Sequence, residues 1–161
     1  MGCFLFLEKG DETMSKQNFI GVEHHAVKDA AEAIRLCGEA LVAKGYTDES
    51  FIAGCIEREA EYPTGLPSVV PVAIPHCQCD GIKESSICVL RLTEPVKFYR
   101  MDDASEHVET KLVFNLAIRG ADAQLSFLQK LMAFVMDEEK VRTCETGSVE
   151  EMLQFVRENL L

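Results

Sequence analysis

Helical spacing of apolar residues marks the first half of the chain. From Val27, apolar residues stand at positions 27, 30, 31, 34, 37 and 41, which predicts a helix that Gly45 ends. Thr47-Asp48-Glu49 has the composition of an N-cap followed by an acidic first turn. A second helix is therefore expected from there, and it must stop before Pro63.

The last third of the chain repeats this helical pattern. Residues 125, 128, 131, 132 and 135 are apolar and predict a helix that Asp122 caps. A short helix is expected over residues 138–144, because acidic residues stand at its start. Ser148 and Glu151 have the spacing of a capping box and predict the start of a C-terminal helix.

Between these helices the apolar residues form short continuous runs, which favour buried strands. We expect strands over residues 19–22, 69–74 (interrupted by Pro71), 87–92 and 112–118. The last run is almost wholly apolar, as in a central strand that is covered on both faces. The order of elements predicts an α/β fold, with a small mixed β-sheet flanked by helices on both faces.

The N-terminal residues differ from the rest of the sequence. Residues 1–13 show no clear periodicity, and Met14 precedes the part that resembles the start of a domain. We therefore expect an N-terminal extension over residues 1–18, with Met14 as the candidate native start, and one domain over residues 19–161. A chain of 161 residues suits this division.

Charge and composition exclude several classes of function. The chain has 16 basic and 27 acidic residues, which argues against nucleic acids and anionic membrane surfaces as partners. No run approaches the roughly 20 apolar residues that span a bilayer, so direct membrane insertion is not expected. The seven cysteines are scattered and odd in number, which favours a reducing compartment. We expect a soluble, cytoplasmic protein.

His76 is the strongest candidate for chemistry. It follows Val72-Ala73-Ile74-Pro75, so it stands just after a buried strand, and Pro75 stiffens the backbone that carries it. A neutral imidazole is a good nucleophile near pH 7. From these residues alone, a partly buried loop histidine without a catalytic role is the more common interpretation.

A set of motifs changes that balance. They are Glu57-Arg58-Glu59, Tyr62-Pro63-Thr64-Gly65, Val72-Ala73-Ile74-Pro75-His76, Leu112-Val113-Phe114-Asn115-Leu116-Ala117-Ile118, the helix from Gln124-Leu125 to Leu131 and the helix after Ser148. In this order and spacing, the set resembles the fructose/mannitol family of enzyme IIA domains of the bacterial sugar phosphotransferase system. The resemblance covers about residues 19–161.

The resemblance implies a phosphoryl carrier that works without a cofactor or a metal of its own. His76 would accept a phosphoryl group from the histidine-containing phosphocarrier protein. It would pass the group to a cysteine of enzyme IIB, which serves the membrane component enzyme IIC. Arg58 matches an arginine of the family and would pair with phosphoryl oxygens. The alternative for Arg58 is an exposed side chain that pairs with neighbouring glutamates.

Gln124 departs from the mannitol-type pattern. Proteins of that type carry a second histidine at the start of the helix after the central strand, where this chain has Gln124. A glutamine can donate a hydrogen bond to a phosphoryl oxygen but supplies neither a proton nor a positive charge. Together with the Pro-Thr-Gly segment and His76-Cys77, Gln124 resembles the galactitol-type branch, which makes galactitol the candidate sugar alcohol.

Two other functions are kept as alternatives. The first is a regulatory enzyme IIA-like sensor that is phosphorylated on the same histidine and binds other proteins. The second is a metal or thiol-redox binding module built on His76, Cys77 and Cys79. Three ligands within four residues are poor geometry for zinc, so no metal site is expected. His107 lies in the polar stretch 102–109 and is expected to be a solvated loop residue.

Overall fold

The computed structural model describes residues 18–161. The elements follow one another as β1 (Phe19–His24), α2 (Ala30–Ala43), α3 (Glu49–Glu61), β2 (Gly65–Leu66), β3 (Val72–Ala73), β4 (Ser86–Tyr99), β5 (His107–Ala117), α4 (Ala121–Val135), α5 (Glu138–Cys144) and α6 (Val149–Leu160). The predicted start at Met14 and nearly all of the predicted extension lie outside the described residues. The division into an extension and one domain over residues 19–161 stays a prediction.

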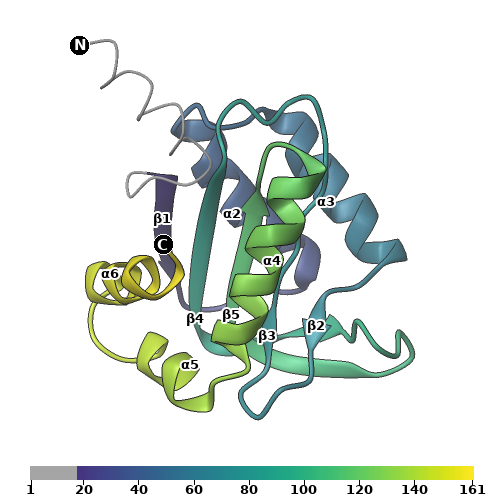
Figure 1. The fold of residues 1–161 in the computed structure, drawn as a ribbon. Helices are drawn as coiled ribbons and strands as arrows, with labels where there is room; N and C mark the ends of the chain where they lie inside the picture. Colours follow the sequence, from purple (N-terminus) through teal and green to yellow (C-terminus); the bar gives the residue numbers. More distant parts are fainter. Residues whose placement is uncertain (1–17) are drawn as a thin grey trace, which may run out of the picture.

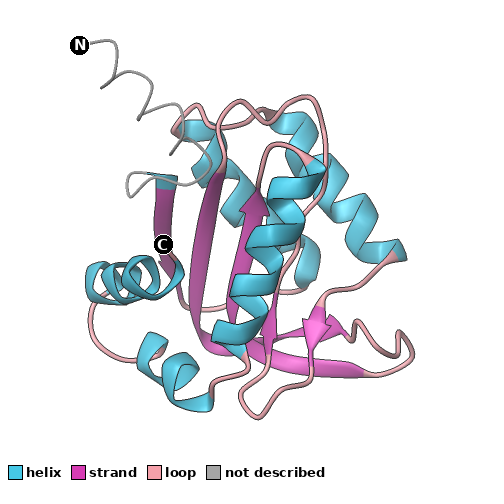
Figure 2. Cartoon of the chain, viewed as in Figure 1, coloured by secondary structure: helices cyan, strands magenta, loops and turns pink. Residues whose placement is uncertain are grey.

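The five strands form one mixed sheet in the order β1-β4-β5-β3-β2. β1 pairs with β4 in parallel and β3 with β5 in parallel, whereas β4–β5 and β2–β3 are antiparallel. Figure 2 shows this sheet between helices. The central position of β5 confirms the expectation drawn from its apolar sequence.

The two faces of the sheet carry separate hydrophobic cores. Along β4, Ile87 and Val89 pack with α4, α5 and α6, whereas Cys88 and Leu90 pack with α2 and α3. This alternation follows from the two-residue period of a strand. Figure 1 shows α4 in front of the sheet and α2 behind it. The predicted fold class, with helices on both faces, is confirmed.

Several predicted boundaries are wrong. The run over residues 69–74 is a strand only at Val72–Ala73, because Pro71 lacks the N–H that a ladder needs. β4 continues to Tyr99 and β5 begins at His107, so the stretch around His107 is not wholly a loop. Asp122 is not a cap, because α4 begins at Ala121 after Gly120, whose φ is 85°.

The first predicted helix begins at Ala30, after the N-cap Asp29, and not at Val27. The predicted starts of α3, α5 and α6 are confirmed. Asp48 caps α3 by accepting a hydrogen bond from Ser50 N, and Asp137 caps α5 by accepting one from Lys140 N. Ser148 and Glu151 form the predicted capping box of α6. Within residues 18–161 no helix is both long enough and apolar enough to cross a bilayer.

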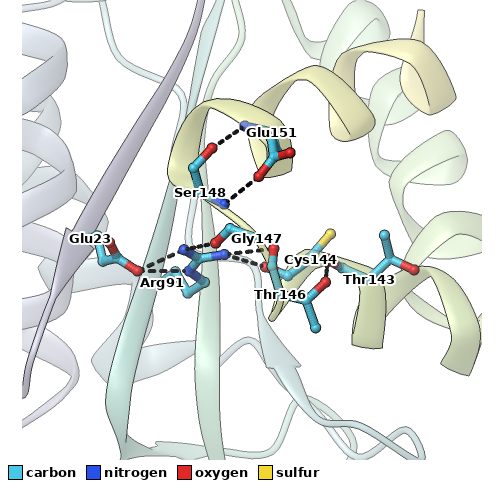
Figure 3. Close-up of polar contacts among 8 residues, drawn as sticks. All are labelled: Glu23, Arg91, Thr143, Cys144, Thr146, Gly147, Ser148 and Glu151. Atoms are coloured by element: carbon cyan, nitrogen blue, oxygen red, sulfur yellow. Dashed lines mark hydrogen bonds and ion pairs between the residues drawn. The ribbon is translucent and has the colours of Figure 1, made fainter.

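Arg91 of β4 links β1 to the turn between α5 and α6 (Figure 3). Its side chain is buried, at 9% exposed, and forms an ion pair with Glu23 of β1 at 2.7 Å. The same guanidinium donates to the carbonyl oxygens of Cys144 (3.2 Å), Thr146 (3.1 Å) and Gly147 (2.8 Å). Those carbonyls end α5 and lead into α6. Arg91 therefore satisfies the backbone of the α5–α6 turn while it fixes that turn to the sheet.

Candidate functional site

His76 lies directly beyond the carboxyl end of β3. β3 runs parallel to β5, and a single bridge between His76 and Leu116 continues that pairing. The helix that follows β5 is α4, so its N-terminus reaches the same edge of the sheet. Carboxyl ends of strands are the usual location of sites in α/β sheets.

The backbone before His76 is held by two donors from β5. The carbonyl oxygen of Pro75 accepts hydrogen bonds from Leu116 N at 3.0 Å and from Asn115 Nδ2 at 3.0 Å. Asn115 is completely buried, so its amide is a fixed donor in a low-dielectric environment. With Pro75 restricting φ as well, the position of His76 is set by the strand and not by a flexible loop.

A buried carboxylate supports the strand from the other side. Glu59 of α3 accepts hydrogen bonds from Thr64 N and from Thr64 Oγ1, both at 2.8 Å. Thr64 Oγ1 accepts in turn from Ile74 N at 3.2 Å. Burial raises the pKa of Glu59, although the two hydrogen bonds from Thr64 oppose that rise. The network ties α3 to the residue two positions before His76.

The hydrogen bond of the imidazole fixes its tautomer. Nδ1 of His76 lies 2.7 Å from the carbonyl oxygen of Ile74. A carbonyl oxygen can only accept, so Nδ1 carries the hydrogen, and the lone pair of the neutral ring is on Nε2. Nε2 has no hydrogen-bond partner among residues 18–161. It is not one of the fully buried atoms there that lack a partner, so it reaches the surface.

The surroundings of His76 favour its neutral form. The residue is only 8% exposed, and this burial lowers the pKa of the imidazole. The hydrogen bond to Ile74 raises the pKa, and the positive charge of Arg58 lowers it again. The pKa is on balance lower than the ordinary histidine value of about 6.5, so the ring keeps its lone pair at neutral pH.

Arg58 of α3 is partly buried and has unused donors. Its side chain forms no ion pair or hydrogen bond within the described part of the chain, which excludes the predicted alternative of pairing with Glu57 or Glu59. The guanidinium lies 5.6 Å from the centre of the Tyr62 ring, a cation–π distance. Tyr62 therefore orients the group without consuming its N–H donors.

Gln124 lies in the first turn of α4 and faces the residue after His76. Its Nε2 donates to the carbonyl oxygen of Cys77 at 3.4 Å. One amide N–H therefore orients the side chain, and the second has no partner in residues 18–161. No side chain caps α4, so its N-terminus also presents backbone N–H groups at this edge.

An open pocket of about 420 Å³ lies beside these groups. Its lining comes from α3 and from the residues after His76: Gly54, Glu57, Arg58, Glu61, Tyr62, Cys77 and Gln78. The pocket brings Arg58 together with the segment that carries His76. The neutral Nε2 of His76, the guanidinium N–H donors of Arg58 and the N-terminus of α4 are together suited to bind an anionic group such as phosphoryl.

The remaining candidate residues lie elsewhere or lack the required geometry. His107 begins β5, its side chain is 47% exposed, and it lies 3.4 Å from Glu109. His76 is bridged to Leu116, at the opposite end of β5. In residues 18–161 no group of three or more His, Cys, Asp or Glu side chains is arranged to hold a metal ion. Cys77 and Cys79 belong instead to a small group of thiols beside α3.

Three supporting residues escaped the sequence analysis as individual candidates. Glu59 stands at the i+4 position of the apolar stripe Phe51–Cys55, and a carboxylate in such a stripe signals a buried polar network. Asn115 is the only polar residue in the apolar run 112–118. Gln78 donates to the carbonyl oxygen of Ile118 at 3.1 Å, and this contact joins residues 40 positions apart, which sequence patterns do not predict.

Comparison with known proteins agrees with this geometry. The family model described as "Phosphoenolpyruvate-dependent sugar phosphotransferase system, EIIA 2" matches residues 14–159. The galactitol-specific EIIA component of Escherichia coli K12 is 31% identical over 83% of this chain and 89% of its own length. The mannitol-specific enzyme IIA component of Geobacillus stearothermophilus is 30% identical over 90% of this chain and 95% of its own length.

A solved structure extends the similarity to three dimensions. Enzyme IIA for mannitol from Escherichia coli, determined in complex with phosphorylated enzyme IIB, superposes with a TM-score of 0.71. The match is 25% identical and covers 90% of this chain and 97% of that one. The predicted resemblance is confirmed: this chain belongs to the EIIA 2 family of the phosphoenolpyruvate-dependent sugar phosphotransferase system and is a phosphotransferase component.

Proposed function

We propose that this protein carries a phosphoryl group on His76 Nε2 during uptake of a sugar alcohol. The donor is the histidine-containing phosphocarrier protein, and the acceptor is a cysteine of the cognate enzyme IIB, which serves enzyme IIC in the membrane. The similarity to galactitol- and mannitol-specific components supports a sugar alcohol, with galactitol as the candidate. The transfers take place in the cytoplasm.

One observation carries the proposal: the Nδ1–H of His76 donates to Ile74 O, while within residues 18–161 neither Nε2 nor the charged Arg58 that influences it has a hydrogen-bond or ion-pair partner. The Nε2 lone pair attacks the phosphorus as the bond from phosphorus to the donor's histidine breaks. The hydrogen bond at Nδ1 then disperses the positive charge that the ring gains. Such transfers depend on positioning and on charge stabilisation more than on proton movement.

Arg58 and Gln124 have separate roles in this proposal. The guanidinium of Arg58 pairs with phosphoryl oxygens through its N–H donors. Burial first, and the positive charge of Arg58 after it, lower the pKa of His76 and so favour the neutral ring before transfer. The second amide N–H of Gln124 and the N-terminus of α4 donate to the remaining oxygen. Glu59, Thr64 and Asn115 act as positioning residues through the backbone of residues 74 and 75.

The test is transfer of ³²P from phosphoenolpyruvate through enzyme I and the phosphocarrier protein. We expect acid-labile label on the wild-type protein and none on His76→Ala, while His107→Ala is labelled like wild type. Label that survives on His76→Ala, or is lost on His107→Ala, would overturn the assignment of the site.

Adding purified enzyme IIB separates transport from a purely regulatory role. A transport component passes its label to an enzyme IIB cysteine within the time of one turnover. A sensor that only binds other proteins keeps the label on His76 when each candidate enzyme IIB is added.

A further inference from the structure

A pair of thiols lies directly beside the proposed phosphoryl site. Sγ of Cys55, on α3, is 3.7 Å from Sγ of Cys77, the residue after His76. Both residues are buried, and Cys79 stands two positions further along. The phosphoryl chemistry described above uses neither sulfur.

The Cys77 sulfur is placed for reaction. Cys77 and Gly54 both line the open pocket, and a Cβ at Gly54 would lie only 2.9 Å from Cys77 Sγ. The missing side chain at Gly54 therefore leaves the sulfur beside the pocket. Hydrogen bonding from Cys55, together with Cys79 and the charge of Arg58, lowers the pKa of Cys77 although burial opposes that change. A thiolate is the form of cysteine that reacts.

Cys55 has complementary surroundings. Its hydrogen bond with Cys77 and its burial raise the pKa of its thiol, so it keeps its proton. Asn115 Nδ2 lies 3.7 Å from its sulfur and 3.0 Å from Pro75 O. The pair thus combines a cysteine whose pKa is lowered with a protonated neighbour in contact, the arrangement of a reactive and a resolving cysteine.

We propose that Cys77 and Cys55 form a redox-active dithiol that peroxide converts to a disulfide, and that this bond slows phosphoryl acceptance at His76. The effect on acceptance rests on the proposed function; formation of the bond does not.

The chemistry balances in two steps. The Cys77 thiolate attacks one oxygen of hydrogen peroxide, the O–O bond breaks, and the departing hydroxide takes up a proton to become water. The product is a sulfenic acid on Cys77. Cys55 Sγ then attacks that sulfur, the S–O bond breaks, and a second water leaves with the thiol proton. The two thiols lose two electrons, and peroxide is reduced to two waters.

The bond would change the site through the backbone. The two sulfurs must approach to about 2 Å, which draws Cys77 toward α3. Cys77 is joined to His76, and its carbonyl oxygen accepts the hydrogen bond of Gln124. Cys55 stands one helical turn before Arg58. The disulfide therefore displaces the nucleophile relative to both groups that are proposed to bind its phosphoryl.

The chain contains a matched control pair. Cys37 of α2 and Cys88 of β4 belong to the same core cluster, and both are completely buried. Hydrogen bonding with Cys88 and burial raise the pKa of Cys37. Like Cys55 and Cys77, this pair brings two buried thiols into one core cluster, but neither residue lines the pocket beside Arg58, so the pair should stay reduced.

The experiment treats the full-length protein with hydrogen peroxide, alkylates the remaining thiols in denaturant and maps the cross-links by mass spectrometry without reduction. We expect a cross-link between Cys55 and Cys77, with Cys37 and Cys88 alkylated. Label transfer to the oxidised protein should fall at least about ten-fold and return with dithiothreitol. In Cys55→Ser, or Cys55→Ala if the serine variant does not fold, dimedone should trap the sulfenic acid on Cys77.

The contrary outcomes are distinct. A Cys37–Cys88 or Cys77–Cys79 bond as the main product, or no cross-link at all, would overturn the dithiol. A complete Cys55–Cys77 bond with unchanged label transfer would overturn its effect on the site. Absence of label on the reduced wild-type protein would instead refute the proposed function while leaving the mapped bond in place.

Discussion

Two arginines of this protein differ in how they use their hydrogen-bond donors: Arg91 holds elements of the fold together, and Arg58 is proposed to bind the phosphoryl group. Arg91 donates to a carboxylate and three carbonyl oxygens between β1 and the α5–α6 turn (Figure 3). Among the described residues, the guanidinium of Arg58 has a cation–π contact with Tyr62 and no hydrogen bond or ion pair, and it borders an open pocket. A guanidinium whose donors are all used can only hold parts together, whereas one with spare donors can take up an anion.

Replacing Arg58 should give the largest change in rate. Arg58→Ala is expected to reduce the rate of phosphoryl acceptance about 100-fold, because a charged donor aimed at developing charge contributes on this scale. The stability of the fold should change little, since within residues 18–161 the variant loses a cation–π contact with Tyr62 but no hydrogen bond to a carboxylate or carbonyl. Arg58→Lys should recover only part of the rate, because a lysine keeps the charge without the fork. Rapid-quench labelling measures both rates; a normal rate in Arg58→Ala would remove Arg58 from the site.

Replacing Arg91 should have the opposite consequences. Arg91→Ala leaves the carbonyl oxygens of residues 144, 146 and 147 without their donor and removes a buried stem, so we expect a loss of about 3 kcal/mol in the free energy of unfolding. Urea denaturation measures this loss. The folded fraction of the variant should still accept phosphoryl at a rate within about two-fold of wild type. A stable Arg91→Ala protein with a slow rate would erase the contrast between the two arginines.

The network below His76 should give an intermediate effect. Thr64→Val removes the hydroxyl that bonds both Glu59 and Ile74 N, at a cost of about 1–2 kcal/mol. Because that hydroxyl positions the strand before His76, acceptance should slow several-fold as well. Thr64→Ser keeps the hydroxyl and serves as the matched control. Equal rates in the valine and serine variants would show that the network supports the fold alone.

The pH dependence should give the smallest effect. The pKa of His76 is lowered on folding, mainly by burial, so acceptance should persist below pH 6.5 and fall only when the folded imidazole is protonated. The unfolded chain binds a proton at His76 more readily than the folded chain. The contribution of His76 to the free energy of unfolding therefore decreases as the pH falls from about 6.5 to the lower pKa of the folded state. NMR titration should show the pKa of His76 rise in Arg58→Ala and stay constant in Arg91→Ala. Equal values in all three proteins would contradict the proximity of Arg58.

The sequence predicted the layers of the fold because its helices and strands have distinct periods, and it predicted His76, Arg58 and Gln124 as candidates through the family resemblance. The periodicity of apolar residues does not determine at which residue a strand begins or ends. The pattern at residues 69–74 therefore suggested a longer strand than Pro71 allows, and the hairpin through His107 was missed.

The supporting contacts also lay beyond the sequence patterns. The partners of Asn115 and Gln78 lie 40 residues away in the chain, and Glu59 reaches Ile74 only through Thr64, so the folded structure is needed to bring these groups to the backbone near His76. The contact between Cys55 and Cys77 is of the same kind.

The central claim is that His76 Nε2 accepts the phosphoryl group while Nδ1 keeps its hydrogen bond to Ile74. Long-range ¹H–¹⁵N NMR of the protein, labelled with ¹⁵N in its histidines and phosphorylated by the phosphocarrier protein, tests it directly. We predict a phosphorus coupling to Nε2 of His76 and a protonated Nδ1. Phosphorylation of Nδ1, or of any other residue, would contradict the account.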